Sequence, residues 1–74
     1  LDKRFIRFGA VGSSDILGVM SDGRFLAIEV KSAKGKLTKH QKVFLDGIRD
    51  AGGVAFVARS IEDVAMGLKL HGRG

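Results

Sequence analysis

The sequence predicts one α/β domain over residues 1–74, a small mixed β-sheet of about four strands flanked by helices. Three observations support this fold class. Short apolar runs with the alternation of strands come first, in the order strand, strand, strand. Two stretches with helical periodicity follow them. A fourth apolar run lies between those helices, and a helix joining two strands favours a crossover to a parallel neighbour.

The first predicted strand, residues 3–8 (KRFIRF), alternates basic and apolar side chains. Two interpretations of Arg7 stay open: a solvated side chain on an edge strand, or a phosphate contact. The loop at residues 9–14 contains Ser13 and Ser14, whose hydroxyls either bind phosphate or only stabilise the turn.

The next two strands form a hairpin over residues 15–31, and its turn length decides which face Asp15 occupies. A two-residue loop would carry Asp15 opposite Val30, on the wrong face. A three-residue loop ending at Gly23 places Asp15 opposite Glu29 instead. The longer loop fits a type I turn followed by a glycine in the left-handed conformation, so we expect the second register.

The second strand of this hairpin is apolar on both faces, which is typical of a central strand covered on each side. Glu29 and Lys31 end it on one shared face. Opposed Cβ atoms lie about 4.5–5.5 Å apart, and two carboxylates so close repel unless one is protonated or a cation lies between them. A divalent metal would satisfy both Asp15 and Glu29, whereas the plainer alternative is a solvated charged face.

A loop follows Lys31, and a helix is predicted from Thr38 to about Ala51, where Gly52-Gly53 terminates it. Thr38 and Gln41 fit a capping box. Gln41 precedes the apolar stripe by helical spacing and should face the sheet. The stripe consists of Phe44, Leu45, Ile48 and Ala51.

Residues 54–58 (VAFVA) are predicted to form a buried strand, and Ser60 to cap a last helix that frays near Gly72. Asp63 completes an S-x-x-D capping pattern. Met20 and Met66 are interpreted as core fillers. The predicted buried face of the last helix is Ile61, Val64, Ala65 and Leu68.

The formal net charge of +5 points to a polyanionic partner, most simply nucleic acid. A ribosomal-type structural role or an anionic membrane surface are the alternatives. The chain has no cysteine, so disulfides and cysteine-based zinc sites are excluded. Because so short a chain has a small core, we expect a homodimer. No apolar run is long enough to span a membrane, and we expect a cytoplasmic protein.

The predicted site combines the carboxylates of Asp15 and Glu29 with the backbone carbonyl of Val30 as ligands of Mg²⁺, for which Mn²⁺ can substitute. Such a metal activates water and neutralises charge on a phosphate. Lys31 would orient the water or stabilise the transition state, and Gln41 would enter from the helix. Basic residues interpreted as phosphate contacts surround the site: Lys34, Lys36, Lys39 and Lys42. His40 and His71 are interpreted as surface histidines.

Asp15, a gap of thirteen residues, Glu29-Val30-Lys31 and the early helical Gln41 together resemble the PD-(D/E)xK nuclease superfamily. The run from Ile28 to Val64 resembles specifically the virus-type replication-repair nuclease (VRR-NUC) domain. It contains the patterns K-G-x-L-(S/T)-x-x-Q and G-G-x-x-x-V-A-x-S.

This resemblance implies a metal-dependent endonuclease in which Asp15, Glu29 and the Val30 carbonyl are ligands, Lys31 is the catalytic lysine and Gln41 assists. It also implies homodimers that act in DNA repair on branched DNA such as Holliday junctions, encoded by phage or bacteria. Ser14 stands where the family usually has proline, and the family's N-terminal helix is expected to be absent or truncated. The competing interpretations are a non-catalytic basic nucleic-acid-binding module and, less favoured, a sequence-specific restriction-type enzyme.

Overall fold

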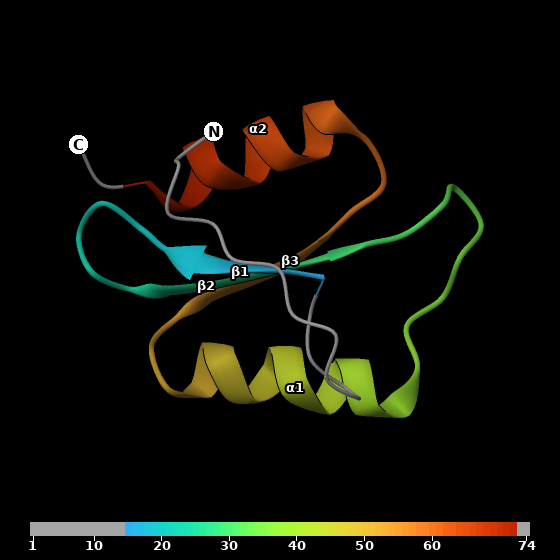
Figure 1. The fold of residues 1–74 in the computed structure, drawn as a ribbon, viewed down its shortest axis with the longest axis horizontal. Helices are drawn as coiled ribbons and strands as arrows, with labels where there is room; N and C mark the ends of the chain where they lie inside the picture. The colour runs from blue at the N-terminus through green and yellow to red at the C-terminus, as the bar shows by residue number, and fades with distance from the viewer. Residues whose placement is uncertain (1–14, 73–74) are drawn as a thin grey trace.

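The computed structural model describes residues 15–72 and has three layers, with a mixed β-sheet between two helices (Figure 1). The predicted α/β class is therefore confirmed, with three strands in the described part of the chain. The predicted strand at residues 3–8 and the loop at 9–14 lie outside it. In chain order the elements are β1 (Ile16–Val19), β2 (Phe25–Val30), α1 (Lys39–Asp50), β3 (Val54–Ala58) and α2 (Ile61–His71).

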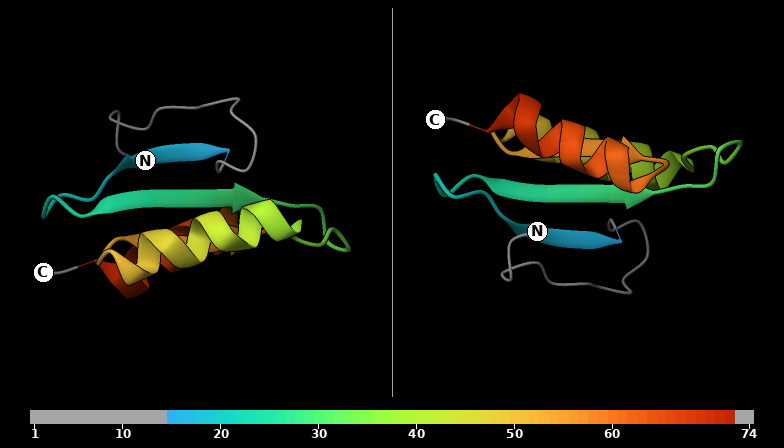
Figure 2. Two further views of the ribbon diagram at one scale, coloured as in Figure 1. Left: turned by 90° about the horizontal axis from the view of Figure 1, so that it is seen from below. Right: turned by 90° about the horizontal axis from the view of Figure 1, so that it is seen from above.

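The sheet has the order β1-β2-β3, with β1 antiparallel to β2 and β3 parallel to it. Helix α1 connects the two parallel strands, as a crossover requires. Figure 2 shows the helices on opposite faces of the sheet, both over the half formed by β2 and β3. The carboxyl ends of β2 and β3 therefore lie at the same edge as the start of β1.

The turn between β1 and β2 is the three-residue loop that the sequence predicts. The Met20 N–H donates to the Arg24 carbonyl at 2.7 Å, and the Gly23 N–H donates to the Met20 carbonyl at 2.9 Å. Gly23 has a φ of +94°, a left-handed conformation that costs glycine little. Since Ile16 pairs with Ile28, the next pair outward is Asp15 with Glu29.

Strand β2 contributes to two separate hydrophobic cores, one on each face of the sheet. This confirms the prediction of a central strand covered on both sides. The core under α2 consists of Met20, Leu26, Ile28, Val54, Ala58 and Val64. The core under α1 consists of Leu17, Ala27, Leu45 and Ala55.

The packed face of helix α2 matches the predicted one in part: Val64 and Leu68 pack into the core as predicted, whereas Ile61 and Ala65 do not. Ile61 is 78% exposed and Ala65 is also exposed, so both predictions of burial were wrong. The packed positions are Val64, Gly67 and Leu68, because Gly67 lets the helix approach the ring of Phe56 closely. This contact rotates the helix and turns its other apolar residues to solvent.

Three smaller predictions also need correction. Met66 is 59% exposed and is no core filler, whereas Met20 is buried as predicted. Ala51 is exposed because it follows the last turn of α1. The Ser60 hydroxyl caps α2 by accepting from the Asp63 N–H at 3.1 Å, but the Asp63 carboxylate accepts from the Arg59 N–H at 2.8 Å rather than from Ser60.

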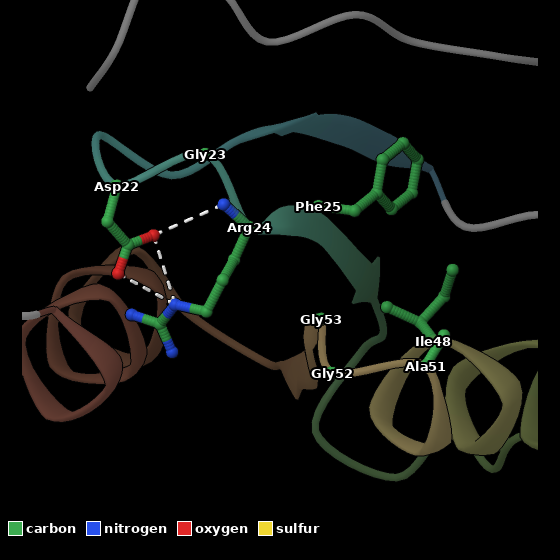
Figure 3. Close-up of a pocket in the computed structure, with 8 residues that line it drawn as sticks. All are labelled: Asp22, Gly23, Arg24, Phe25, Ile48, Ala51, Gly52 and Gly53. Atoms are coloured by element: carbon green, nitrogen blue, oxygen red, sulfur yellow. Dashed lines mark hydrogen bonds and ion pairs between the residues drawn. The ribbon is translucent and has the colours of Figure 1, made fainter.

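A hollow lies at the end of β2 opposite to Glu29 (Figure 3). Its charged residues, Asp22 and Arg24, form an ion pair with 2.8 Å between Asp22 Oδ2 and Arg24 Nε. The Arg24 guanidinium also donates to the His71 carbonyl and so ties the β1–β2 turn to the end of α2. We assign this hollow a structural role.

The close approach at Gly67 gives a test with a matched control. A Cβ added at Gly67 would lie 2.4 Å from the Phe56 ring, whereas one at Gly47 of α1 would have no neighbour within 4 Å. Both substitutions gain the helix propensity of alanine, about 1 kcal/mol. We expect Gly47→Ala to raise the free energy of unfolding and Gly67→Ala to lower it by about 1–3 kcal/mol through overpacking. Urea unfolding measures both, and a stabilised Gly67→Ala would contradict the packing of α2.

Candidate active site

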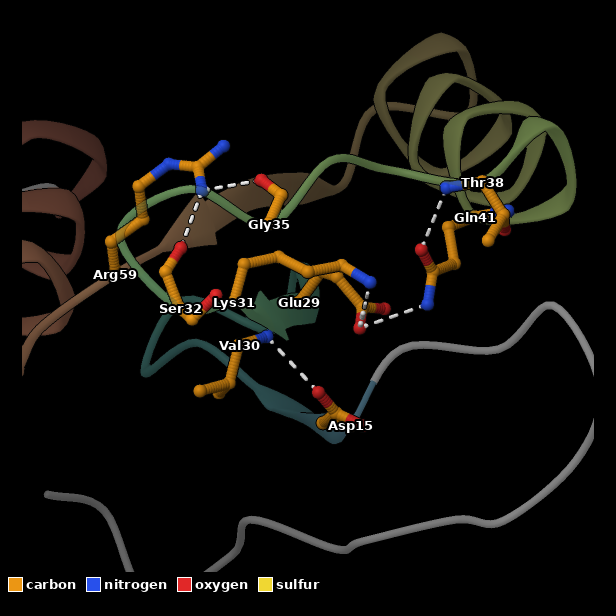
Figure 4. Close-up of polar contacts among 9 residues, drawn as sticks. All are labelled: Asp15, Glu29, Val30, Lys31, Ser32, Gly35, Thr38, Gln41 and Arg59. Atoms are coloured by element: carbon orange, nitrogen blue, oxygen red, sulfur yellow. Dashed lines mark hydrogen bonds and ion pairs between the residues drawn. The ribbon is translucent and has the colours of Figure 1, made fainter.

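The candidate site forms where three elements meet at one edge of the sheet (Figure 4). Asp15 precedes β1, Glu29 is the next-to-last residue of β2, and Lys31 follows that strand. Gln41 comes from the first turn of α1. Because β1 runs antiparallel to β2, the start of one strand lies beside the end of the other, and this brings the two acids together.

Glu29 is the most buried charged residue among those described, with only 2% of its surface exposed. Its Oε2 accepts from Gln41 Nε2 at 3.1 Å and lies 3.9 Å from Lys31 Nζ. Its Oε1 is buried and has no hydrogen-bond partner in the described part of the chain. A buried carboxylate oxygen without a donor lowers the stability of the fold, and binding of a proton or a cation to this atom would remove that penalty.

Asp15 is held at the end of β2 through the backbone. Its Oδ2 accepts from the Val30 N–H at 3.1 Å. The N–H and carbonyl of one strand residue point to the same side of the strand, so the Val30 carbonyl is also directed toward β1. The carbonyl predicted as a metal ligand therefore points to the side from which Asp15 comes.

The proximity of the two acids changes the acidity of Glu29. The pKa of Glu29 is raised from 4.5 to about 7, chiefly because the carboxyl is buried. Asp15 contributes in the same direction, as a hydrogen-bond acceptor for the protonated form of Glu29 and through its negative charge. The positive charge of Lys31 acts in the opposite sense and lowers it. Near neutral pH the Glu29 carboxyl is thus present in both its protonated and its charged form.

The donors fit a cation that prefers oxygen ligands, such as Mg²⁺, better than a metal that prefers nitrogen or sulfur ligands. Among residues 15–72, no group of three or more His, Cys, Asp or Glu side chains gathers around a common point. The available donors are two carboxylates and one carbonyl, all of them oxygen. Mg²⁺ is commonly bound by one or two carboxylates while it keeps several waters and binds phosphate. Glu29 Oε1, which has no donor within the described chain, suits such an ion.

Gln41 is oriented by the cap of its own helix. Its Oε1 accepts from the Thr38 N–H at 2.9 Å, and its N–H donates to Thr38 Oγ1 at 3.1 Å, which confirms the predicted capping box. With the oxygen of the amide engaged at the cap, the amide nitrogen faces Glu29. The cap thereby fixes which end of Gln41 reaches the carboxylate.

The predicted phosphate contacts divide into two groups. Arg7, Ser13 and Ser14 lie outside the described residues. The four lysines are exposed and lie on the loop after β2 and on the first turn of α1: Lys34, Lys36, Lys39 and Lys42.

Arg59 was missed by sequence reasoning. It follows β3 directly, and its Nη1 donates to the carbonyls of Ser32 and Gly35 at 2.7 and 2.6 Å (Figure 4). Its position in the sequence could have indicated this role. A cation that directly follows a buried parallel strand lies at the same edge of the sheet as the end of β2.

A family profile described as the VRR-NUC domain matches residues 2–62 of the chain. The match includes Asp15, Glu29, Lys31 and Gln41. No curated protein and no solved structure matches the chain significantly. Within residues 15–72, neither helix is long and apolar enough to cross a membrane.

The pKa of Glu29 predicts how stability depends on pH in the absence of metal. A folded pKa of about 7 against 4.5 when unfolded means that the folded state binds more protons between these values. The free energy of unfolding should therefore fall as pH rises from about 5 to 7, by about 2–3 kcal/mol. Urea unfolding in EDTA at several pH values measures this.

The matched pair for this experiment is Glu29→Gln and Glu62→Gln. Glu62 is exposed on α2, so its substitution should leave the decline unchanged. Glu29→Gln should flatten it, because the amide cannot ionise. A decline that persists in Glu29→Gln would show that another group controls stability in this range.

Proposed function

Because the chain belongs to the VRR-NUC domain family, which implies a nuclease-type function and DNA binding, we propose that it is a Mg²⁺-dependent endodeoxyribonuclease. It hydrolyses phosphodiester bonds in branched DNA such as Holliday junctions, and Mn²⁺ substitutes for Mg²⁺. The observation that carries the proposal is the pair Asp15 and Glu29, opposed on neighbouring strands, with a buried Glu29 oxygen that has no donor among the described residues.

Each site residue has a distinct task in this proposal. The proposed ligands of the metal are Asp15, Glu29 and the Val30 carbonyl. The chemistry that a bound metal would supply there is activation of a water and Lewis-acid polarisation of the phosphate oxygens. Lys31, with its Nζ 3.9 Å from Glu29 Oε2, places positive charge where the attacked phosphate gains negative charge. Gln41 holds the Glu29 carboxylate by its 3.1 Å hydrogen bond.

The surrounding charge supports a DNA substrate. The net charge of +5 and the exposed lysines beside the site favour phosphate contacts, which release counterions and make binding depend on salt. The resemblance to short VRR-NUC proteins supports branched DNA. A homodimer would supply two sites related by twofold symmetry, and a four-way junction contains two DNA strands related by the same symmetry.

The second candidate is a basic nucleic-acid-binding module without catalysis. It is favoured by the ion pair between Lys31 and Glu29 and by the hydrogen bond from Gln41, since these contacts alone also stabilise a buried acid. The two candidates differ in whether wild-type protein cleaves what it binds.

Substitution of Lys31 distinguishes a loss of cleavage from a loss of DNA binding. We expect Lys31→Ala to lower the single-turnover rate on a labelled four-way junction in Mg²⁺ by at least about 100-fold, because it removes charge stabilisation in the transition state. Binding, measured by gel shift in Ca²⁺, should change little. Lys69→Ala, an exposed lysine near the end of α2, loses the same charge and should cleave normally.

The same assay decides between the candidates. Cleavage of the junction should be faster than that of a linear duplex of the same sequence. If wild-type protein binds the junction tightly but cleaves no substrate in Mg²⁺ or Mn²⁺, the basic binding module is correct.

Metal binding can be tested without activity. Calorimetric titration with Mn²⁺ should show a site in wild-type protein that is lost in Asp15→Asn and kept in Asp50→Asn, an exposed acid at the end of α1. Because the ion must displace the proton of Glu29, affinity should rise by up to about tenfold between pH 6 and pH 7. Equal Mn²⁺ affinity in wild-type protein and Asp15→Asn would remove Asp15 as a ligand.

A further inference from the structure

The loop between β2 and α1 starts directly after Lys31 and carries two of the predicted phosphate contacts, Lys34 and Lys36. It has no helix or strand over residues 32–37. Its only internal backbone hydrogen bond among those described joins the Gly35 N–H to the Ser32 carbonyl at 3.1 Å and closes a tight turn. One such bond, exposed to water, contributes too little to order a turn by itself.

Arg59 supplies the missing contacts from outside the loop. Its Nη1 donates to the carbonyl of Ser32 at 2.7 Å and to that of Gly35 at 2.6 Å, which are the two ends of the turn. Hydrogen bonds from a charged donor are stronger than those between neutral groups. Figure 4 shows the guanidinium over this turn, on the side away from Asp15.

Arg59 is itself anchored to the fold. Its backbone N–H donates to Asp63 Oδ2 at 2.8 Å, in the capped first turn of α2. On the other side of the loop, the Lys31 N–H donates to the Ala58 carbonyl at 3.0 Å. Two contacts thus connect the turn to the end of β3. The Lys31 N–H binds Ala58 just before the turn, and Arg59 binds the Ser32 and Gly35 carbonyls within it.

We propose that Arg59 is a positioning residue that fixes the loop after β2 and so restricts where Lys34 and Lys36 can lie relative to the metal-binding acids. The role given to the two lysines rests on the proposed function, whereas the fixing of the loop does not. The rival role for Arg59 is direct contact with a DNA phosphate, since its Nε and Nη2 have no hydrogen-bond partner within residues 15–72.

Limited trypsin digestion tests the fixing of the loop without DNA or metal. Trypsin cleaves after Lys34 and Lys36, and mass spectrometry reports the rate at each bond. Because cleavage requires the loop to open locally, loss of two charge-assisted hydrogen bonds should accelerate it by about tenfold or more in Arg59→Met. Methionine keeps the aliphatic stem of Arg59 and has no donor.

Arg49→Met is the matched control, because Arg49 also donates to a backbone carbonyl, that of Ala55 at 3.0 Å, far from the loop along β3. It should leave cleavage after Lys34 and Lys36 unchanged. Arg59→Lys, which keeps a charged donor, should restore part of the protection and guards against a general loss of folding in Arg59→Met. Unchanged cleavage of the loop in Arg59→Met would overturn the proposal.

A double-mutant cycle then separates positioning from direct contact. Binding to a four-way junction is measured in Ca²⁺ for Arg59→Met in the wild-type and in the Lys34→Ala/Lys36→Ala backgrounds. If Arg59 acts through the two lysines, its substitution weakens binding only in the wild-type background. An equal loss in both backgrounds means direct contact and overturns positioning. If no form binds DNA, the proposed function fails, while the digestion result still decides whether Arg59 holds the loop.

Discussion

The structure depends on the register of the hairpin formed by β1 and β2. Side chains alternate along a strand, so a slip of one residue would send Asp15 to the face of the sheet opposite Glu29. The left-handed conformation of Gly23 and the hydrogen bond from its N–H to the Met20 carbonyl set the turn length. The placement of Asp15 opposite Glu29 follows from this one turn.

The register has an energetic consequence for Glu29. The carboxylate is placed in the core under α1, next to a second acid, and one of its oxygens has no donor among residues 15–72. In a domain this small, such a group lowers stability noticeably, as its raised pKa indicates. Functional sites often lower the free energy of unfolding of the free protein, and binding of the ligand raises it again. A divalent ion bound by Glu29 would have this effect here.

The parallel pairing of β2 with β3 is the second organising feature. It requires the crossover through α1, which delivers Gln41 to Glu29, and it aligns the carboxyl ends of both strands at one edge. Residues that follow these strands are therefore neighbours although they are far apart in the chain. Arg59 reaches the loop after β2 for this reason, much as ligand sites gather at strand ends in other α/β folds.

The sequence by itself determined what depends on local rules. Period-two alternation, the glycine of the turn and the capping residues Thr38 and Gln41 predicted strands β1 and β2, the hairpin register and the start of α1 correctly. The tertiary structure decided what depends on packing between distant elements. The rotation of α2 follows from the fit of Gly67 against Phe56, and local periodicity could not distinguish that face from one containing Ile61. The burial of Glu29 Oε1 and the contact of Arg59 with the loop after β2 likewise arise only when distant chain segments meet at one edge of the sheet, because burial and long-range hydrogen bonds are properties of the assembled fold.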